Sequence, residues 1–221
     1  MAQLPIHKLG LPWIITSSLV SILSGFQCIT HHSTTVAAIF IFFTVITALL
    51  VWFFRDPPRQ PDPAALAKLS SAKPIISPAD GKVTDIIQNE NTVTVGVFLS
   101  ILDCHIQHSP ISGRVTRIER KAGKCLPAFL ASASKNNVSC DNEIFNAQDK
   151  LTISVKQITG IAARRIVSFV QEGQSLERGN KLGMILLGSR VELTMPKNRV
   201  TLLIKEGDRL YTGQTIIGSY V

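Results

Sequence analysis

The sequence predicts a mostly β domain of the α+β class, built as a β sandwich or barrel and preceded by an N-terminal transmembrane helical hairpin. Three observations predict this architecture: an almost uncharged apolar block at the start, a series of short β runs separated by turn residues, and an internal repeat with paired glycines. A chain of 221 residues is long enough for one such domain with a real core, together with an appendage.

Charge separates the two parts of the chain. Of the 23 Lys and Arg residues only Lys8 precedes residue 55, and none of the 15 Asp and Glu residues does. A basic domain next to a membrane is expected to be attracted to an anionic lipid surface. Nucleic acid is disfavoured as a partner, because the basic residues are scattered and have few aromatic neighbours.

The apolar block, residues 1–54, contains two candidate membrane helices. Residues 35–54 carry no charge and no proline, and at about 1.5 Å per residue they reach about 30 Å, enough to cross a bilayer core. Residues 11–29 form a weaker candidate that is diluted by serines. A cleaved signal peptide is the alternative for this first segment, but no small-x-small cleavage site is followed by a polar mature start.

Basic residues flank the pair of segments and are absent from the loop between them. Lys8 lies on one side and Arg55 and Arg59 on the other, whereas the loop contains only His31, His32 and small polar residues. The positive-inside rule therefore predicts that both flanks lie in the cytoplasm. We expect a hairpin anchor in the cell (inner) membrane with the rest of the chain on the cytoplasmic side.

A linker and a β domain follow the anchor. Residues 55–73 are predicted to be a linker, because 55–63 is too rich in proline for a helix or a sheet. Within 74–221 the best helical candidate is 127–134. The predicted strands are 82–87, 92–102, 113–120, 151–158, 165–171, 184–187, 190–194 and 199–205.

Residues 170–182 and 204–216 form an internal repeat. Both follow the pattern apolar-x-Glu-Gly-x-x-Leu-x-x-Gly-x-x-apolar, with an offset of 34 residues. Glycines at this spacing suit tight turns that flank a short strand. The same pattern occurs in lipoyl and biotinyl carrier domains, but no Met-Lys or Asp-Lys-Ala hairpin tip is present here. The repeat predicts a lipoyl-like architecture without a carrier function.

The four cysteines, Cys28, Cys104, Cys125 and Cys140, form no Cys-x-x-Cys pair. We expect reduced thiols in a cytoplasmic setting. No metal site is predicted, because no pair of His or Cys residues has a zinc-like partner pair elsewhere in the sequence.

Few residues after the anchor could carry acid–base chemistry. His105 and His108 are the only histidines there, so a histidine base would have to be one of them, although solvated loop histidines are the alternative. Asp80 precedes a glycine in a turn sequence that could be only a turn. Arg164 and Arg165 suit a phosphate contact or a solvated pair, and Asn142 with Glu143 is a weaker polar candidate.

Ser189 is the candidate nucleophile. It lies between apolar runs and after a glycine, although a turn between two strands would also explain it. A serine hydrolase would need Gly-x-Ser-x-Gly, and residues 187–191 read Leu-Gly-Ser-Arg-Val. The missing outer glycines disfavour a hydrolase.

Five separated motifs occur in one order along residues 53–221. They are Phe-Phe-Arg-Asp-Pro-Pro-Arg at 53–59, Ile-Ser-Pro-Ala-Asp-Gly-Lys-Val at 76–83, Phe-Leu-Ser-Ile-Leu-Asp-Cys-His at 98–105 with Pro-Ile-Ser-Gly-Arg-Val at 110–115, Gly-Ile-Ala-Ala-Arg-Arg-Ile-Val at 160–167, and Leu-Gly-Ser-Arg-Val at 187–191. Together they resemble the phosphatidylserine decarboxylase proenzyme family in its short, membrane-anchored form. Arg190 is familiar in short members, whereas many long members have Thr at this position.

The resemblance implies a self-processing reaction. Ser189 would attack the carbonyl of Gly188, and the chain would break into a β chain, 1–188, and an α chain, 189–221, with Ser189 converted to a covalent pyruvoyl group. Asp80, a histidine and Ser189 would form the triad for this step. His105 and His108 both match family positions, and their division between autocleavage and decarboxylation stays open.

The resemblance also implies the reaction and the partners. The pyruvoyl group would form a Schiff base with phosphatidylserine, release CO2 and yield phosphatidylethanolamine, with no external cofactor and no metal. The substrate would be a membrane phospholipid, either diacyl or an ether-linked archaetidylserine. Arg164, Arg165, Asn142 and Glu143 are candidates for binding it. The α and β chains would form a heterodimer able to oligomerise. The alternative is a non-enzymatic, membrane-tethered adaptor with a lipoyl-like fold, which explains the repeat but not the five motifs.

Overall fold

The computed structural model describes residues 6–31, 33–67, 69, 72–124, 126–127, 133–160, 165–186 and 189–221, with the side chains of 31 and 133 left out. The chain divides into two compact units, Met1–Pro58 and Arg59–Val221. Each unit is described by itself below.

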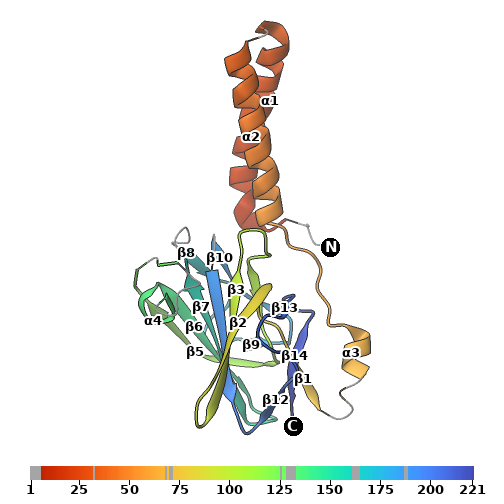
Figure 1. Cartoon of the computed structure of the whole chain (residues 1–221), viewed down its shortest axis with the longest axis vertical. Helices are drawn as coiled ribbons and strands as arrows, with labels where there is room; N and C mark the ends of the chain where they lie inside the picture. The colour runs from red at the N-terminus through yellow and green to blue at the C-terminus, as the bar shows by residue number, and fades with distance from the viewer. Residues whose placement is uncertain are drawn as a thin grey trace. The chain divides into compact units, whose positions relative to one another are not determined.

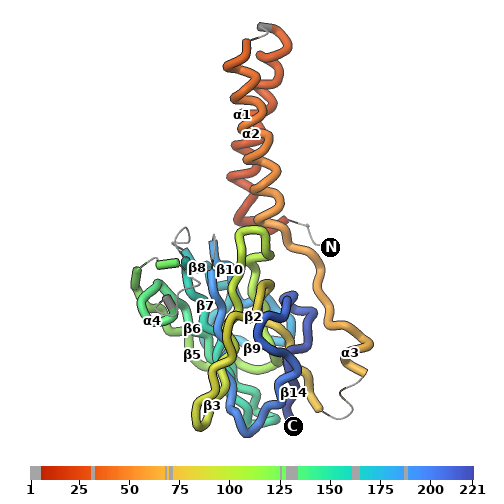
Figure 2. The backbone as a smooth tube through the Cα atoms, in the orientation of Figure 1, coloured from red at the N-terminus to blue at the C-terminus, as the bar shows by residue number. Residues whose placement is uncertain are grey.

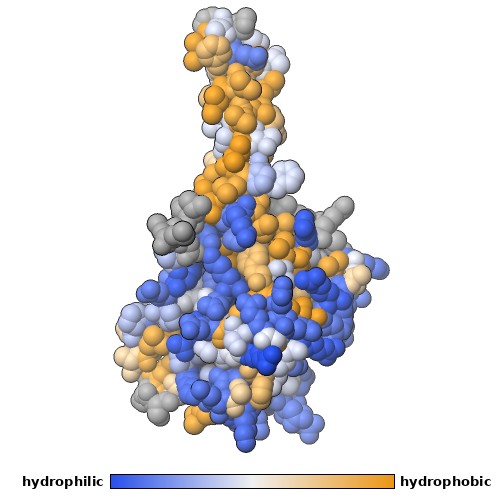
Figure 3. All heavy atoms as spheres, turned by 180° about the vertical axis from the view of Figure 1, so that it is seen from behind, coloured by the Kyte–Doolittle hydropathy of each residue, from blue (hydrophilic) through white to orange (hydrophobic). Residues whose placement is uncertain are grey.

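The first unit is a helical hairpin. A 3-10 turn, η1 (Lys8–Gly10), leads into α1 (Leu11–His31), and α2 (Thr34–Phe53) packs against α1. Both helices are long and apolar enough to cross a membrane, and Figure 3 shows mostly hydrophobic side chains along them. The predicted apolar hairpin is confirmed.

The serines that dilute the first apolar segment have a structural role. The hydroxyls of Ser21 and Thr44 lie 2.7 Å apart, and Thr47 donates to the Ser17 hydroxyl at 2.9 Å. These bonds join α1 to α2 at two levels. Hydrogen bonds between helices satisfy polar groups that lipid cannot satisfy.

The second unit is mostly β, as predicted, and its main element is a curled sheet of eight strands in the order β13-β2-β3-β11-β7-β6-β5-β9 (Figure 1). Two smaller sheets have the orders β1-β14-β12 and β4-β10-β8. The elements are α3 (Pro63–Ala67), β1 (Lys73–Ile76), β2 (Gly81–Gln88), β3 (Thr92–Leu99), β4 (Ile106–His108), β5 (Gly113–Lys121), α4 (Ala133–Asn136), β6 (Ser139–Asn146), β7 (Leu151–Thr159), β8 (Arg165–Ser168), β9 (Ser175–Leu176), β10 (Lys181–Leu186), β11 (Ser189–Pro196), β12 (Val200–Leu202), β13 (Arg209–Leu210) and β14 (Ile216–Tyr220).

Each predicted β run contains a strand, but the sequence analysis missed β1, β4, β14 and the longer strand β6. The side chains of Cys140, Asn142 and Asn146 occupy inward positions of this strand, so its pattern does not alternate between apolar and polar residues. The helical candidate 127–134 falls largely outside the described residues, and α4 begins at its end. The predicted linker includes the short helix α3, whose first residue is Pro63; proline is tolerated there because the first N–H of a helix has no partner within it.

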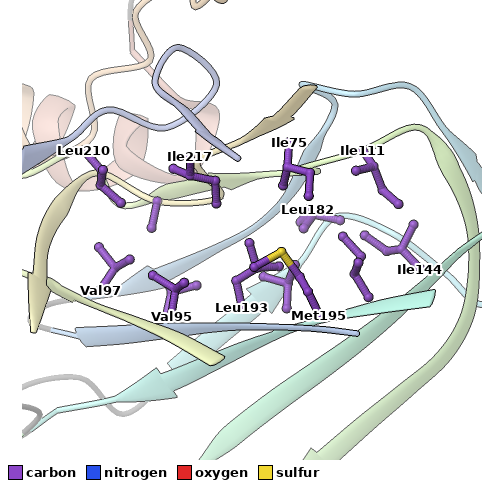
Figure 4. Packing of buried hydrophobic residues seen from close by; sticks show 14 of the residues in the cluster. Ile75, Val95, Val97, Ile111, Ile144, Leu182, Leu193, Met195, Leu210 and Ile217 are labelled. Atoms are coloured by element: carbon purple, nitrogen blue, oxygen red, sulfur yellow. The ribbon is translucent and has the colours of Figure 1, made fainter. Parts of the chain in front are cut away.

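The core lies between the curled sheet and the two small sheets. Figure 4 shows Val95, Val97, Leu193 and Met195, from β3 and β11, across from Ile75 and Ile217 of the β1-β14-β12 sheet. Strand β11, from the last part of the chain, lies between β3 and β7, so a late segment runs between earlier ones (Figure 2). The end of the chain therefore completes the core.

The described strands of the second unit fall into two matching sets. One set is β1–β3 with β11–β14, and the other is β4–β10; each contributes one small sheet and half of the curled sheet. The two copies of the predicted repeat take matching places, since β13 pairs with β2 at one edge and β9 pairs with β5 at the other. The repeat glycines, Gly173, Gly179, Gly207 and Gly213, all have positive φ, so the prediction that they form turns is confirmed.

A second repeat, which the sequence analysis missed, comprises residues 77–83 and 109–115. Both begin with Ser-Pro and end with Gly-x-Val. Ser77 Oγ donates to Ala79 O and Ser109 Oγ donates to Ile111 O, both at 2.7 Å. The N–H groups of Gly213 and Gly179 donate to the carbonyls of these same serines, both at 2.9 Å. Each segment is thus a turn held by one copy of the first repeat.

Candidate active site

Ser189 is the first residue of β11 and lies in the middle of the curled sheet. It pairs with Leu99 of β3 and with Thr159 of β7. Its side chain shares the inner face of β11 with Val191 and Leu193, because alternate residues of a strand point to the same side. The side chain is fully buried, and within the described part of the chain its hydroxyl has no hydrogen-bond partner. A buried hydroxyl without a partner is costly, which suggests a chemical role.

The loop that carries the histidines starts beside Ser189. Leu99, its partner, is the last residue of β3, and Asp103, Cys104 and His105 follow. The carbonyl of His105 accepts from the N–H of Ile185 at 3.2 Å, which ties this loop to β10, the strand leading toward Ser189. The topology therefore brings His105 and Ser189 to the same end of the sheet.

Asp80 is buried at the turn before β2 and accepts three hydrogen bonds. Its Oδ1 accepts from the N–H of Thr212 at 2.7 Å, and its Oδ2 accepts from the N–H of Cys104 at 3.3 Å and from Arg59 Nη2 at 3.0 Å. Burial raises the pKa of the Asp80 carboxyl above its ordinary value, and Arg59 offsets only part of this. A buried carboxyl whose pKa is shifted by burial and by a nearby charge is typical of a functional site.

His108 is connected to Asp80 through Thr212. The His108 Nδ1 lies 2.9 Å from the hydroxyl of Thr212, whose N–H donates to Asp80. The N–H of His108 donates to the carbonyl of Pro78 at 3.0 Å, and the ring is almost fully buried. His108 and Asp80 thus share one residue that fixes both.

His105 is fully buried and its ring is oriented by its own loop. Its Nδ1 lies 2.8 Å from the carbonyl oxygen of Asp103. A carbonyl can only accept, so Nδ1 carries a proton, and in the neutral form of the ring the lone pair is on Nε2. The carbonyl of His105 accepts from Gln107 Nε2 at 2.8 Å, which holds the backbone of the same residue.

A chain of buried amides supports His105 from inside the sheet. Gln157 Nε2 donates to Gln107 Oε1 at 2.7 Å, and Asn142 Nδ2 donates to Gln157 Oε1 at 3.2 Å. Glu143, the neighbour of Asn142, lies on the opposite face of β6 and accepts from the hydroxyl of Thr116 at 2.6 Å. The structure therefore separates Asn142 from Glu143 and places only Asn142 in the network that reaches His105.

Three predicted site residues remain: Arg164, Arg165 and Gly188. Arg165 is the exposed first residue of β8, and Arg164 and Gly188 lie outside the described residues. Across the ranges that the structure describes, no group of three or more His, Cys, Asp and Glu side chains could hold a metal ion.

Arg59 and Thr212 were not predicted as site residues. Both contact Asp80 from distant parts of the sequence. Gly213, which follows Thr212, has a φ of 72°, and a β-carbon there would lie 3.0 Å from Arg59 Cβ. Two sequence features pointed to this region: the arginine at the end of the 53–59 motif and the second glycine of the repeat. Neither feature predicts that Arg59 or Thr212 contacts Asp80.

Comparisons with known proteins agree with this arrangement. The family model described as "Phosphatidylserine decarboxylase" matches residues 46–218. A phosphatidylserine decarboxylase proenzyme of Carboxydothermus hydrogenoformans is 42% identical over 177 residues, covering 76% of this chain and 78% of the relative. A putative archaetidylserine decarboxylase proenzyme of Methanosarcina barkeri is 33% identical over 208 residues, covering 94% of this chain and 95% of the relative. The match spans the Asp80 turn, both histidines and Ser189, and the chain belongs to the phosphatidylserine decarboxylase family.

Proposed function

We propose that this chain is a self-processing, pyruvoyl-dependent decarboxylase that converts phosphatidylserine to phosphatidylethanolamine and CO2. One observation carries the proposal: the buried hydroxyl of Ser189, which has no partner among the described residues, lies at the sheet end where the loop of Asp103 to His105 begins, and Asp80 contacts that loop. The family match and the names of the relatives support the reaction.

The first reaction is on the chain itself. Ser189 Oγ attacks the carbonyl carbon of Gly188, and the peptide nitrogen leaves and takes up a proton, so an ester replaces the amide. Loss of the Cα proton then eliminates the Gly188 carboxylate and leaves a dehydroalanine at residue 189. Its enamine becomes an imine, and water releases ammonia and leaves a pyruvoyl group on the α chain, 189–221.

His108 acts as the base for this step. It is connected to Asp80 through Thr212, and a carboxylate that orients a histidine favours the protonated ring that forms when the serine loses its proton. The half-buried Arg59 favours the ionised form of Asp80 and so opposes part of the effect of burial on its pKa. Asp80, Thr212 and His108 therefore work as one unit.

His105 acts in decarboxylation. Its Nδ1 is held by the Asp103 carbonyl, so Nε2 is the ring nitrogen that takes up a proton from solvent and would then deliver it to the substrate carbon that has lost CO2. The pyruvoyl group, when formed, supplies the electron sink for the loss of CO2. The group would replace Ser189 and so occupy the position of its buried side chain, on the inner face of the sheet.

The substrate is a membrane phospholipid, and the hairpin confines the enzyme to the membrane that holds it. We place the second unit on the cytoplasmic side, in line with the basic residues next to the helices, and the α and β chains remain together as a heterodimer able to oligomerise. Arg165 with Arg164 is the candidate contact for the lipid phosphate. Relatives are named for phosphatidylserine and for archaetidylserine, so both lipids are tested.

The test is a decarboxylation assay on the full chain in detergent or vesicles. With phosphatidylserine labelled at the serine carboxyl, we expect release of labelled CO2 and formation of phosphatidylethanolamine. The matched control is Ser189→Ala, which should fold, remain uncut and release none. Equal release by the control would refute Ser189 as the source of the cofactor. Folded wild-type protein that releases no CO2 from either lipid would refute the decarboxylase.

A further inference from the structure

Arg190, the residue after Ser189, makes a buried three-way contact on the outer face of the sheet. Its Nε donates to Glu192 Oε1 at 2.9 Å, Nη1 to Thr84 Oγ1 at 2.8 Å and Nη2 to Asp85 Oδ1 at 2.6 Å. Only 5% of the residue is exposed. Each nitrogen of the guanidinium therefore has its own acceptor.

Two features of the neighbouring strands make room for the Arg190 side chain. Arg190 lies on β11, reaches across β3 and contacts β2. On β3 it passes over Gly96, where a β-carbon would lie 2.2 Å from Nη2. A bulge between Val83 and Asp85 places Thr84 as the extra residue of β2, so that two neighbouring residues face the arginine. The bulge at Thr84, the glycine at position 96 and the carboxylate of Asp85 thus all lie around the Arg190 guanidinium.

The charges in this contact are stabilised by one another. Burial acts to raise the pKa of the Asp85 carboxyl, but hydrogen bonds from Arg190 and Thr84 outweigh it and lower this pKa below its ordinary value. Burial acts to lower the pKa of Arg190, and its bonds to Asp85 and Glu192 raise it instead. The pair is therefore ionised in the folded protein, and such forked contacts fix direction as well as distance.

The contact matters because residue 189 becomes a chain end. If the chain breaks before Ser189, as in the proposed function on which this inference rests, residue 189 loses its link to residue 188 and keeps its pairing with Leu99 and Thr159. Chain ends are poorly ordered unless they are tied down. Arg190 would then be the second residue of the α chain and the first side chain that can hold it.

We propose that Arg190 is a positioning residue that fixes residue 189 on the sheet, first for autocleavage and then as the pyruvoyl-bearing end of the α chain. It acts through the strand and does not touch the substrate. Its partners Thr84 and Asp85 on β2 serve as the fixed point, because β2 stays in the β chain after the break.

The test compares Arg190→Lys and Asp85→Asn with the wild type and with Arg117→Lys. Lysine keeps the charge but cannot form the fork, and Asp85→Asn removes one carboxylate while keeping the arginine. Arg117 forms an exposed ion pair with Glu119 on β5, so Arg117→Lys is a matched control outside the site. The readouts are the rate of cleavage on denaturing gels, the melting temperature, and kcat and KM per pyruvoyl group, counted by intact mass.

Misplacing a reacting group by about 1 Å costs up to about 100-fold in rate. We therefore expect Arg190→Lys to slow cleavage about 10- to 100-fold and to lower kcat per pyruvoyl group with KM unchanged. Asp85→Asn should give a smaller loss of the same kind, and Arg117→Lys none. If Arg190→Lys fails to fold, Asp85→Asn decides the question.

Wild-type rates of cleavage and wild-type kcat per pyruvoyl group in the folded variants would overturn this inference, even if their melting temperatures fell. Wild-type protein that stays uncut would instead refute the proposed function, so the two failures are distinguishable.

Discussion

The turn at residues 77–83 and the turn at 109–115 are built alike, but the fourth residue is Asp80 in the first and Ser112 in the second. Each is closed by a serine hydroxyl and by an N–H of a repeat glycine. In the first turn Asp80 Oδ1 accepts from the N–H of Thr212 at 2.7 Å, and in the second Ser112 Oγ accepts from the N–H of Arg178 at 3.0 Å. A hydroxyl is thus enough for the structural contact, and the charge of Asp80 is extra to the needs of the turn.

The strands differ in the same way at their first residues. Ser189 begins β11 and Leu151 begins β7, at the matching place in the other set of strands. Both are fully buried, but Leu151 belongs to the apolar core and Ser189 carries a hydroxyl without a partner among the described residues. The two sets of strands therefore differ in what they carry. The set with Leu151 and the turn at 109–115 has structural residues at these positions, and the set with Ser189 and the turn at 77–83 has polar groups suited to catalysis.

The largest effect is expected when the first turn is made to resemble the second, which tests whether Asp80 has a role beyond the turn. Asp80→Ser should keep the bond to the N–H of Thr212 but remove the charge that supports His108. Groups that assist proton transfer contribute about 100- to 10,000-fold, so we expect autocleavage to slow by at least about 100-fold in a folded protein. Gel analysis over days, with a melting curve, measures this. Cleavage at the wild-type rate would show that Asp80 is only a turn residue.

Variants of the two histidines should affect different steps, autocleavage for His108 and decarboxylation for His105. His108→Ala is expected to leave most of the chain uncut, because His108 Nδ1 contacts the hydroxyl of Thr212, a residue that also binds Asp80. His105→Ala is expected to cleave and then to show a kcat per pyruvoyl group that is lower by about 100-fold. Cleavage yield and turnover are measured on the same samples. The opposite pattern would exchange the two roles.

Arg59→Gln should change the pH dependence of cleavage. Burial raises the pKa of Asp80 and Arg59 lowers it, so removing the arginine raises this pKa further. The ionised carboxylate is lost as pH falls through that pKa, and the acid limb of the rate profile should therefore move to higher pH. Arg117→Gln, on an exposed pair, is the control. An unmoved limb in Arg59→Gln would argue against Asp80 as the titrating group.

The smallest effect is expected in the structural turn. Ser112→Ala removes one hydrogen bond to an exposed N–H and should lower the free energy of unfolding by about 1 kcal/mol or less, with cleavage unchanged. Denaturant titration and the gel assay check both. Slowed cleavage in this variant would mean that the two turns are not divided into structure and chemistry.

Local patterns in the sequence predicted the elements with local causes. The repeat glycines were predicted as turns because a positive φ favours glycine, and Asp80, His105, His108 and Ser189 were found as candidates from their residue types. The strand β6 was missed because the amide of Asn142 points inward into a polar network. No hydropathy pattern reports such a network.

Contacts between residues far apart in the sequence could not be predicted from local patterns either. Thr212 is 132 residues from Asp80, and Arg190 meets Asp85 across a third strand at Gly96. These contacts exist only once the strands are paired. The sequence therefore indicated which residues carry chemistry, and the fold was needed to show which residues hold them.

The central claim is tested most directly by the intact mass of the purified wild-type protein. The account predicts two chains, one of residues 1–188 and one of 33 residues, 189–221, that begins with a pyruvoyl group in place of Ser189 and resists N-terminal sequencing. A single chain of 221 residues in folded, active protein would contradict it.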